Sequence, residues 1–337
     1  MVSVAFAAVT KEHAGRTVLR SLTLDVDDGT ICALIGPSGC GKTTALRLLA
    51  GLDQPTSGEI RIGRRRVNDV PTRERGLGMV TQVATLLPTR PTEDSIGLPL
   101  DLRSDVDADE RRRRIEEQAL ALDIGDLLRR PADTLSGGEA QVAQVARAVI
   151  ARPDVLLLDE PLARIDPARR TVVRADLVRL QELYGVTTLW VTADQADALA
   201  VAHRVAVLID GRLEQVGPPM EVYRRPRTLA VARFVGEPAI GVVRTRLGDR
   251  TVDLGIRPHD LRVAAPGAAG TRFDGTVVGV DVLGRRAVAT VTVDGGELRW
   301  DGAPISTRVG DRVELVVDPE RVHLFDPATG VALSHPE

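Results

Sequence analysis

The chain has 337 residues, of which 43% are hydrophobic, 27% are charged and 2% are aromatic. This length allows two globular domains, each large enough for a core of its own, in a protein of ordinary composition. The formal net charge of −3 provides no overall electrostatic field that would recruit nucleic acid or an anionic lipid surface, which argues against both as partners.

The first strong feature along the chain is a glycine-rich turn between a strand and a helix. Residues 2–9 and 22–27 predict strands, and the apolar run 31–35 predicts a buried one directly before the turn. Glycines in the turn permit backbone conformations and close approaches that a Cβ atom would forbid. Successive N–H groups can then surround a polyphosphate at the positive end of the following helix. The predicted phosphate-binding residues are Gly36, Pro37, Ser38, Gly39, Cys40, Gly41, Lys42, Thr43 and Thr44.

Two side chains of this turn have the chemistry that phosphate binding needs. Lys42 can reach the outer phosphates as a point charge, and the hydroxyl of Thr43 is placed to ligate Mg²⁺. The sequence contains only one other lysine, Lys11, so lysine is retained here in a chain that otherwise uses arginine. A glycine-rich turn that binds nothing is the alternative interpretation. Lysine and threonine in register after a buried strand argue against it.

The middle of the chain changes from short strands to helices. Strands are predicted over residues 59–62 and 77–81, and the second ends at Gln82. Helical spacing over 94–103, 107–122 and 137–151 then predicts an inserted helical subdomain at about residues 88–151. Within it, the arginines 111–114 follow several acidic residues, and we interpret them as a solvated helix face.

The remainder of the chain predicts two domains of different class. The apolar run 155–158 is typical of a central parallel strand buried on both faces. A helix over 168–183, a strand over 187–191, a short helix from 194, and strands over 205–209 and 213–216 follow it. This alternation predicts an α/β domain over residues 1–236. From about residue 240 the helical patterns disappear, and short alternating stretches with a hairpin signal at Asp294-Gly295 predict a small all-β domain over 240–337.

Several motifs follow the phosphate loop in a fixed order. Leu135-Ser136-Gly137-Gly138-Glu139 opens a helix, Asp159-Glu160 ends the buried strand, and Asp166 follows. With Gln82, these motifs resemble the ATP-binding cassette (ABC) family over residues 1 to about 236. Three further stretches, 51–60, 194–226 and the tail 255–261 with 317–330, are similar to the ATPase subunits of sugar importers and their C-terminal regulatory domain. The resemblance implies an α/β P-loop NTPase cassette with an inserted helical subdomain, followed by a small all-β, OB-like domain.

The resemblance also implies a role for each motif residue. In the family, two cassettes enclose two ATP molecules, each between the phosphate loop of one copy and the LSGG-type loop of the other. Asp159, at the carboxyl end of a strand, would hold Mg²⁺ through water, and Glu160 is the candidate base for the attacking water. Gln82 would contact Mg²⁺ and this water. The remaining nucleotide contacts would come from Ser136, Gly137, Gly138 and Glu139, from Asp166 across the dimer, and from His13 stacking on adenine.

The LSGGE motif also has a purely structural interpretation. Ser136 and Glu139 form the S-x-x-E pattern of a capping box, which satisfies free N–H groups at a helix start. The two interpretations are compatible, because a glycine-rich helix N-terminus also attracts a phosphate group.

The expected partners also follow from the resemblance. A cassette of this type works as a dimer with a second copy or a homologue, two transmembrane permease subunits and an extracytoplasmic substrate-binding protein, and without nucleic acid. No apolar stretch approaches the roughly 18 residues of a membrane-spanning helix, and no signal-peptide pattern opens the sequence. We therefore expect a peripheral location on the cytoplasmic face of the cell membrane. The cargo would be an oligosaccharide, polyol or glycerol phosphodiester, although related cassettes serve polyamines, iron or sulfate.

The sequence departs from the family pattern at one position of direct chemical importance. The family has histidine after Val-Thr in the segment before the short helix, where it contacts the γ-phosphate. This chain has Ala193 there. An ATP-binding cassette with impaired hydrolysis is therefore the alternative hypothesis, although Glu160 is intact. Soluble ABC proteins of DNA repair or translation are disfavoured, because the chain has one cassette and no sustained heptads.

Overall fold

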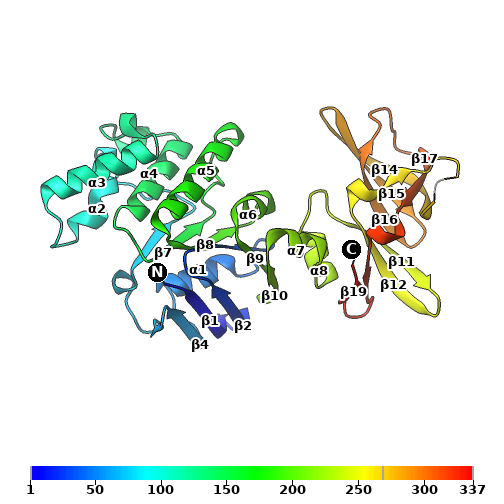
Figure 1. The fold of residues 1–337 in the computed structure, drawn as a ribbon, viewed down its shortest axis with the longest axis horizontal. Helices are drawn as coiled ribbons and strands as arrows, with labels where there is room; N and C mark the ends of the chain where they lie inside the picture. The colour runs from blue at the N-terminus through cyan, green and yellow to red at the C-terminus, as the bar shows by residue number, and fades with distance from the viewer. Residues whose placement is uncertain (1, 268, 336–337) are drawn as a thin grey trace. The chain divides into compact units, whose positions relative to one another are not determined.

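The computed structural model describes residues 2–267 and 269–335 and contains two compact units, residues 1–219 and 220–337 (Figure 1). The sequence places its change of texture later, at 236–240. The two short helices α7 (Pro219–Arg224) and α8 (Leu229–Phe234) account for the difference. Leu229 and Ala232 of α8 form a buried cluster with Ile240 and Phe325 of the β-rich part, so the α8 segment belongs to the core of that unit.

The N-terminal unit is built on a six-stranded sheet with strand order β10-β9-β3-β8-β7-β6. Neighbouring strands from β9 to β6 are parallel, and β10 is antiparallel to β9. The strand bounds are β3 Ile31–Ile35, β6 Leu77–Val80, β7 Val155–Asp159, β8 Thr187–Thr192, β9 Arg204–Ile209 and β10 Arg212–Gly217. Every residue of β3, β7 and β8 is buried, as the continuous apolar runs predicted for β3 and β7.

Different elements cover the two faces of this sheet (Figure 1), and each face has its own hydrophobic core. On one face, α1 (Lys42–Ala50) packs with a second sheet of strand order β2-β1-β4-β5. On the other face lie the helices α4 (Gly137–Val149) and α5 (Pro167–Tyr184), while the short helix α6 (Gln195–Val201) lies beside β3 and β8. The second sheet consists of β1 Val4–His13, β2 Arg16–Val26, β4 Ser57–Ile62 and β5 Arg65–Arg66. This packing fixes the strand ends that build the site described below.

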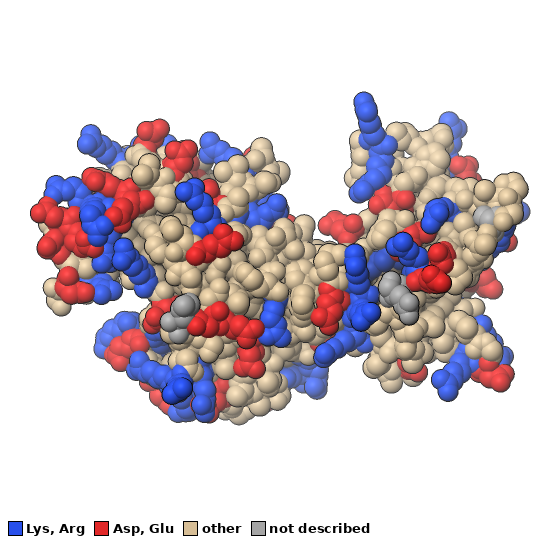
Figure 2. Space-filling model, viewed as in Figure 1, with Lys and Arg blue, Asp and Glu red and all other residues tan. Residues whose placement is uncertain are grey.

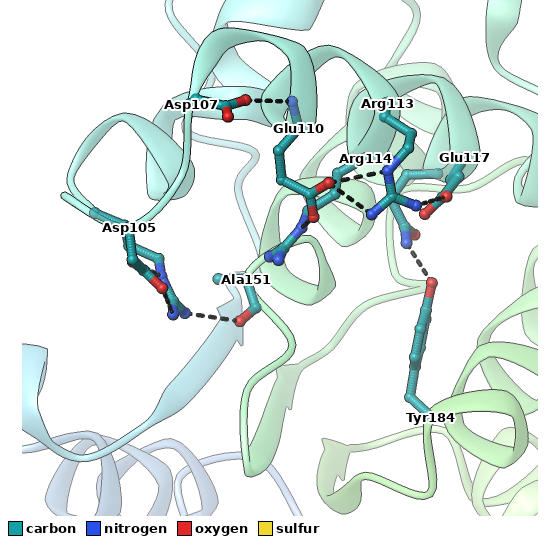
Figure 3. Close-up of polar contacts among 10 residues, drawn as sticks. Asp105, Asp107, Glu110, Arg113, Arg114, Glu117, Ala151 and Tyr184 are labelled. Atoms are coloured by element: carbon teal, nitrogen blue, oxygen red, sulfur yellow. Dashed lines mark hydrogen bonds and ion pairs between the residues drawn. The ribbon is translucent and has the colours of Figure 1, made fainter.

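The predicted helical insertion consists of α2 (Thr92–Asp101), α3 (Ala108–Ala121) and α4. Most arginines of this run pair with carboxylates of the same helix: Arg113 contacts Glu110 and Glu117, and Arg114 donates to Glu110 (Figure 3). Arg111 instead pairs with Asp101 of α2. Blue and red side chains lie intermixed over this part of the surface (Figure 2). The charge run is thus an ion-paired helix face that reaches solvent, as predicted. No helix in the described ranges has both the length and the apolar character to cross a membrane.

The C-terminal unit is a nine-stranded antiparallel sheet of order β13-β17-β14-β15-β16-β11-β12-β18-β19. Val293 pairs with Gly296, so Asp294-Gly295 forms the predicted hairpin turn, with Gly295 at a φ of 86°. The strands are β11 Gly241–Leu247, β12 Arg250–Ile256, β13 Arg262–Val263, β14 Thr271–Leu283, β15 Arg286–Val293, β16 Gly296–Ala303, β17 Arg312–Val317, β18 Val322–Phe325 and β19 Ala332–Ser334. The prediction of an all-β domain is confirmed.

Candidate nucleotide-binding site

The phosphate loop requires glycine at two places. A Cβ atom on Gly36 would lie 2.0 Å from the carbonyl oxygen of Leu208 on the neighbouring strand β9. Gly41 has a φ of 111° and forms the N-terminal cap of α1 without any side-chain hydrogen bond. The free N–H groups at this helix start therefore have no protein side chain in competition with an anion.

Lys42 is held inside the loop. Its side chain lies at the first residue of α1 and is 6% exposed, and Nζ donates to the carbonyl oxygens of Gly36 (2.7 Å) and Pro37 (3.0 Å). These carbonyl contacts hold the positive charge of Lys42 within the loop. The arrangement suits a polyphosphate, since a fixed cation in a partly buried site acts more strongly than one in bulk water.

A hydroxyl and a carboxylate that suit Mg²⁺ lie beside the loop. The Thr43 hydroxyl donates to Asp159 Oδ1 at 3.2 Å. Asp159 ends β7 and is 8% exposed, and burial raises the pKa of its carboxyl, partly offset by the Thr43 hydrogen bond and by Lys42. Mg²⁺ prefers oxygen ligands and takes only a few from the protein when phosphates supply others. Among the described residues, no group of three or more His, Cys, Asp or Glu is arranged to hold a metal ion, and a site completed by phosphate oxygens needs none.

The carboxylate of the next residue, Glu160, accepts hydrogen bonds from the end of β8 and from the residue after it. Its backbone has a φ of 48°. Oε1 accepts a hydrogen bond from the backbone N–H of Ala193 (2.8 Å), and Oε2 accepts one from the Thr192 hydroxyl (3.2 Å). Burial raises the pKa of Glu160, whereas these two donors and Lys42 lower it. A desolvated carboxylate held at both oxygens is suited to orient and deprotonate water.

Parallel strands bring the motif residues together. In the sheet, β8 lies between β3 and β7, and β6 lies beside β7. The carboxyl ends of these strands lead into the phosphate loop, Asp159-Glu160, Thr192-Ala193 and Gln82 at one edge. Gln82 itself is exposed, two residues after β6. Ligands of open α/β sheets bind at this edge.

Three other predicted contacts lie apart from this cluster. Ser136 Oγ accepts from Glu139 N (3.3 Å), and Glu139 Oε2 accepts from Ser136 N (2.7 Å), so the capping box is present. Around Gly138 no atom lies within 4 Å of a hypothetical Cβ, which leaves this helix start open to a ligand. Asp166 caps α5 through the N–H of Ala168, and His13 is exposed at the end of β1. In the described ranges, none of these residues hydrogen-bonds to the phosphate loop.

Sequence reasoning missed the residues that hold Glu160 and the segment after β8 in place. Thr192 positions Glu160, and Arg170 of α5 pairs with Asp194 (2.7 Å), the residue after Ala193. The position of Thr192 at the end of a buried strand beside β7 is a signal that could have identified it. The pairing of Arg170 with Asp194 depends on how α5 packs beside α6, which no local pattern specifies.

Alkylation of Cys40 is expected to block nucleotide binding, and ATP is expected to protect the thiol. The structure adds that this reaction is slow at neutral pH, because burial raises the pKa of Cys40 and the side chain is 6% exposed. The thiolate is the reactive form, so the rate should rise about tenfold per pH unit below that pKa. The measurement is the rate of N-ethylmaleimide incorporation between pH 7 and 9, with and without ATP.

The second cysteine is the internal control. Cys32 is 1% exposed, and burial raises the pKa of its thiol to about 12, so it should stay unmodified. An unchanged ATP affinity after confirmed modification of Cys40 would show that this residue does not border the nucleotide.

Two family models match the chain. One, described as ABC transporter, matches residues 19–163, and the other, described as TOBE domain, matches residues 254–325. A xylose/arabinose import ATP-binding protein of Haloferax volcanii is 38% identical over 97% of this chain and 93% of its own length. A trehalose/maltose import ATP-binding protein of Thermococcus litoralis is 37% identical over 99% of this chain and its own full length (100%). A diacetylchitobiose uptake ATP-binding protein of Streptomyces coelicolor is 35% identical over the same shares, 99% and 100%.

Solved structures agree with the fold of the N-terminal unit. A dimeric bacterial ABC transporter cassette superposes with a TM-score of 0.59 at 29% sequence identity, covering 64% of this chain and 98% of the cassette. The same cassette is also known as a dimer in a post-hydrolysis state bound to ADP and phosphate, with the same TM-score of 0.59. The predicted cassette fold is confirmed.

Proposed function

The chain belongs to the ABC transporter family of ATPases, and from this we propose that it energises an importer of a sugar or related carbohydrate. The observation that carries the proposal is similarity along both units: the three import proteins described above each align with at least 97% of this chain. Similarity confined to the cassette would fit many ATP-driven machines. Similarity that includes the β-rich unit favours this class of importer.

The chemistry of the site supports ATP hydrolysis. Phosphoryl transfer to water depends mainly on positioning and on neutralisation of phosphate charge. The phosphate loop and Lys42 would bind the triphosphate, and Glu160 would accept a proton from the attacking water. Thr43, Asp159 and Gln82 would hold Mg²⁺, directly or through water, and the ion would supply charge neutralisation at the phosphate oxygens.

We propose the assembly that the family resemblance implies. A second copy of the chain, or a homologous cassette, would place its Ser136–Glu139 loop and Asp166 against the nucleotide, with His13 at the adenine. Two permease subunits would hold the dimer at the cytoplasmic face of the membrane, and an extracytoplasmic protein would deliver the cargo. The dimeric state of the solved cassette and the open helix start at Gly138 support this arrangement.

The test is uptake by cells that lack the chain. A deletion strain would be complemented with the unmodified chain or with Lys42→Ala, and labelled pentoses, disaccharides and glycerol 3-phosphate would be supplied beside a polyamine, sulfate and iron. We expect uptake of at least one carbohydrate to be lost on deletion and to be restored only by the unmodified chain. Permeases should co-purify with a tagged copy. Carbohydrate uptake that is unchanged on deletion, together with purification free of permeases, would contradict the proposal.

A further inference from the structure

Three polar side chains on one face of α4 hold the segment that follows β6. Gln141, Gln144 and Arg147 are spaced by three residues, which places them in one row along the helix. Gln141 Nε2 donates to Thr81 O at 3.4 Å, and Arg147 donates through both terminal nitrogens to Thr85, with Nη2 at 2.9 Å from the Thr85 hydroxyl. Segment 81–85 contains Gln82 and has no regular secondary structure of its own.

Gln144 makes the central contact of this row. Its side chain is 0% exposed. With the amide oriented so that both polar atoms are satisfied, Nε2 donates to Thr81 O and Oε1 accepts from Thr81 N, each at 3.1 Å. The amide thus continues the hydrogen-bonding pattern of the edge strand β6 for one residue beyond its end. A buried amide that lost both bonds would carry a full desolvation penalty, so this contact fixes the backbone at Thr81.

Just beyond the segment, the chain is again anchored to the helical insertion. The backbone N–H of Leu87 donates to the Ser95 hydroxyl of α2 at 2.8 Å. Gln82 is therefore an exposed side chain on a stretch of chain whose backbone is held by hydrogen bonds on both sides of it. The geometry leaves its side chain free to turn toward the sheet edge, while α4 sets where its backbone lies.

We propose that Gln144 is a positioning residue for ATP hydrolysis, acting through Gln82. The inference rests on the proposed function, because it takes ATP as the substrate and Gln82 as part of the site. Since α4 begins at the Ser136–Glu139 motif and carries Gln144 two turns later, a nucleotide bound at the helix start and the backbone of Gln82 are linked by one rigid element. Binding at the motif is thereby transmitted to the edge of the sheet.

The experiment compares Gln144→Met with a matched control, Gln118→Met. Gln118 is also a buried glutamine of the helical insertion (5% exposed), but its amide donates to Tyr184, away from segment 81–85. Single-turnover hydrolysis of radiolabelled ATP by the full chain in excess would be measured beside ATP affinity. We expect Gln144→Met to slow hydrolysis about tenfold with affinity within about twofold of the unmodified chain, and Gln118→Met to leave both within about twofold.

The decisive measurement combines each variant with Gln82→Ala. If Gln144 acts through Gln82, Gln144→Met should have no further effect on hydrolysis in the Gln82→Ala background. Rate losses that multiply, or a Gln82→Ala variant with normal hydrolysis, would overturn the inference. Neither result would affect the proposed function, which fails separately if the unmodified chain neither binds nor hydrolyses ATP. Should Gln144→Met not fold, Arg147→Lys, which keeps the charge but loses the paired contact to Thr85, is tested in the same cycle.

Discussion

Replacement of Glu160 by glutamine is expected to reduce ATP hydrolysis by about 10²- to 10⁴-fold, the range that general-base catalysis contributes. Glutamine has the size of glutamate, so the packing at the end of β7 should survive. Its amide oxygen can still accept the hydrogen bond from Ala193 N, which the carboxylate accepts at 2.8 Å. The amide cannot accept a proton from water, however, and the base is lost without loss of the fold.

The same variant should retain ATP binding, because the groups that contact phosphate in the proposed site lie in the loop and on α1. The readouts are steady-state hydrolysis, ATP affinity and the dimer fraction in the presence of ATP. The dimer fraction should rise, because hydrolysis no longer separates the two copies. Glu182→Gln, an exposed carboxylate on α5, is the control and should behave like the unmodified chain. Hydrolysis by Glu160→Gln at more than about a tenth of the unmodified rate would assign the base to another group.

The two hydrogen bonds to the Glu160 carboxylate show how much of this site could be predicted from sequence patterns alone. Continuous apolar runs predicted β3 and β7, a strand was also expected where β8 lies, and Asp159 and Glu160 were expected at the end of β7. That Thr192 and Ala193 hold the Glu160 carboxylate depends on β7 and β8 being neighbours in the sheet. Sequence order separates these residues by about thirty positions, and only the sheet order joins them.

Errors in the predicted elements have similar physical causes. The strands β1 and β2 run farther than predicted because they contain register shifts and positive-φ residues, Ala8 (48°) and Ser21 (52°), which interrupt a clean alternation. The helices α7 and α8 have six residues each, too few for a helical period to stand out. The contact of Gln144 with Thr81 joins two elements about sixty residues apart and has no local signature.

Replacement of Ala193 by histidine is expected to raise hydrolysis about 10- to 100-fold. The backbone N–H of residue 193 donates to Glu160, so this contact is kept by any side chain. Residue 193 is exposed at the strand edge that borders the phosphate loop, which gives an imidazole room to turn toward the nucleotide. A hydrogen bond from imidazole to a charged phosphate group contributes about 1.5–3 kcal/mol, and this energy sets the expected gain if it is realised mainly in the transition state.

Phenylalanine at the same position separates the hydrogen bond from the added ring. Ala193→Phe fills similar space but donates nothing, so it should not accelerate hydrolysis. If both variants gain equally, the effect comes from packing around the segment 192–194. A further outcome is that Ala193→His leaves the hydrolysis rate unchanged while the unmodified chain already hydrolyses ATP and Glu160→Gln abolishes that activity. In that case the hydrogen bonds from the Thr192 hydroxyl and the Ala193 N–H are sufficient to position the base. A gain confined to histidine would instead mean that this chain binds ATP well and hydrolyses it slowly, and that its transporter requires a second, faster cassette.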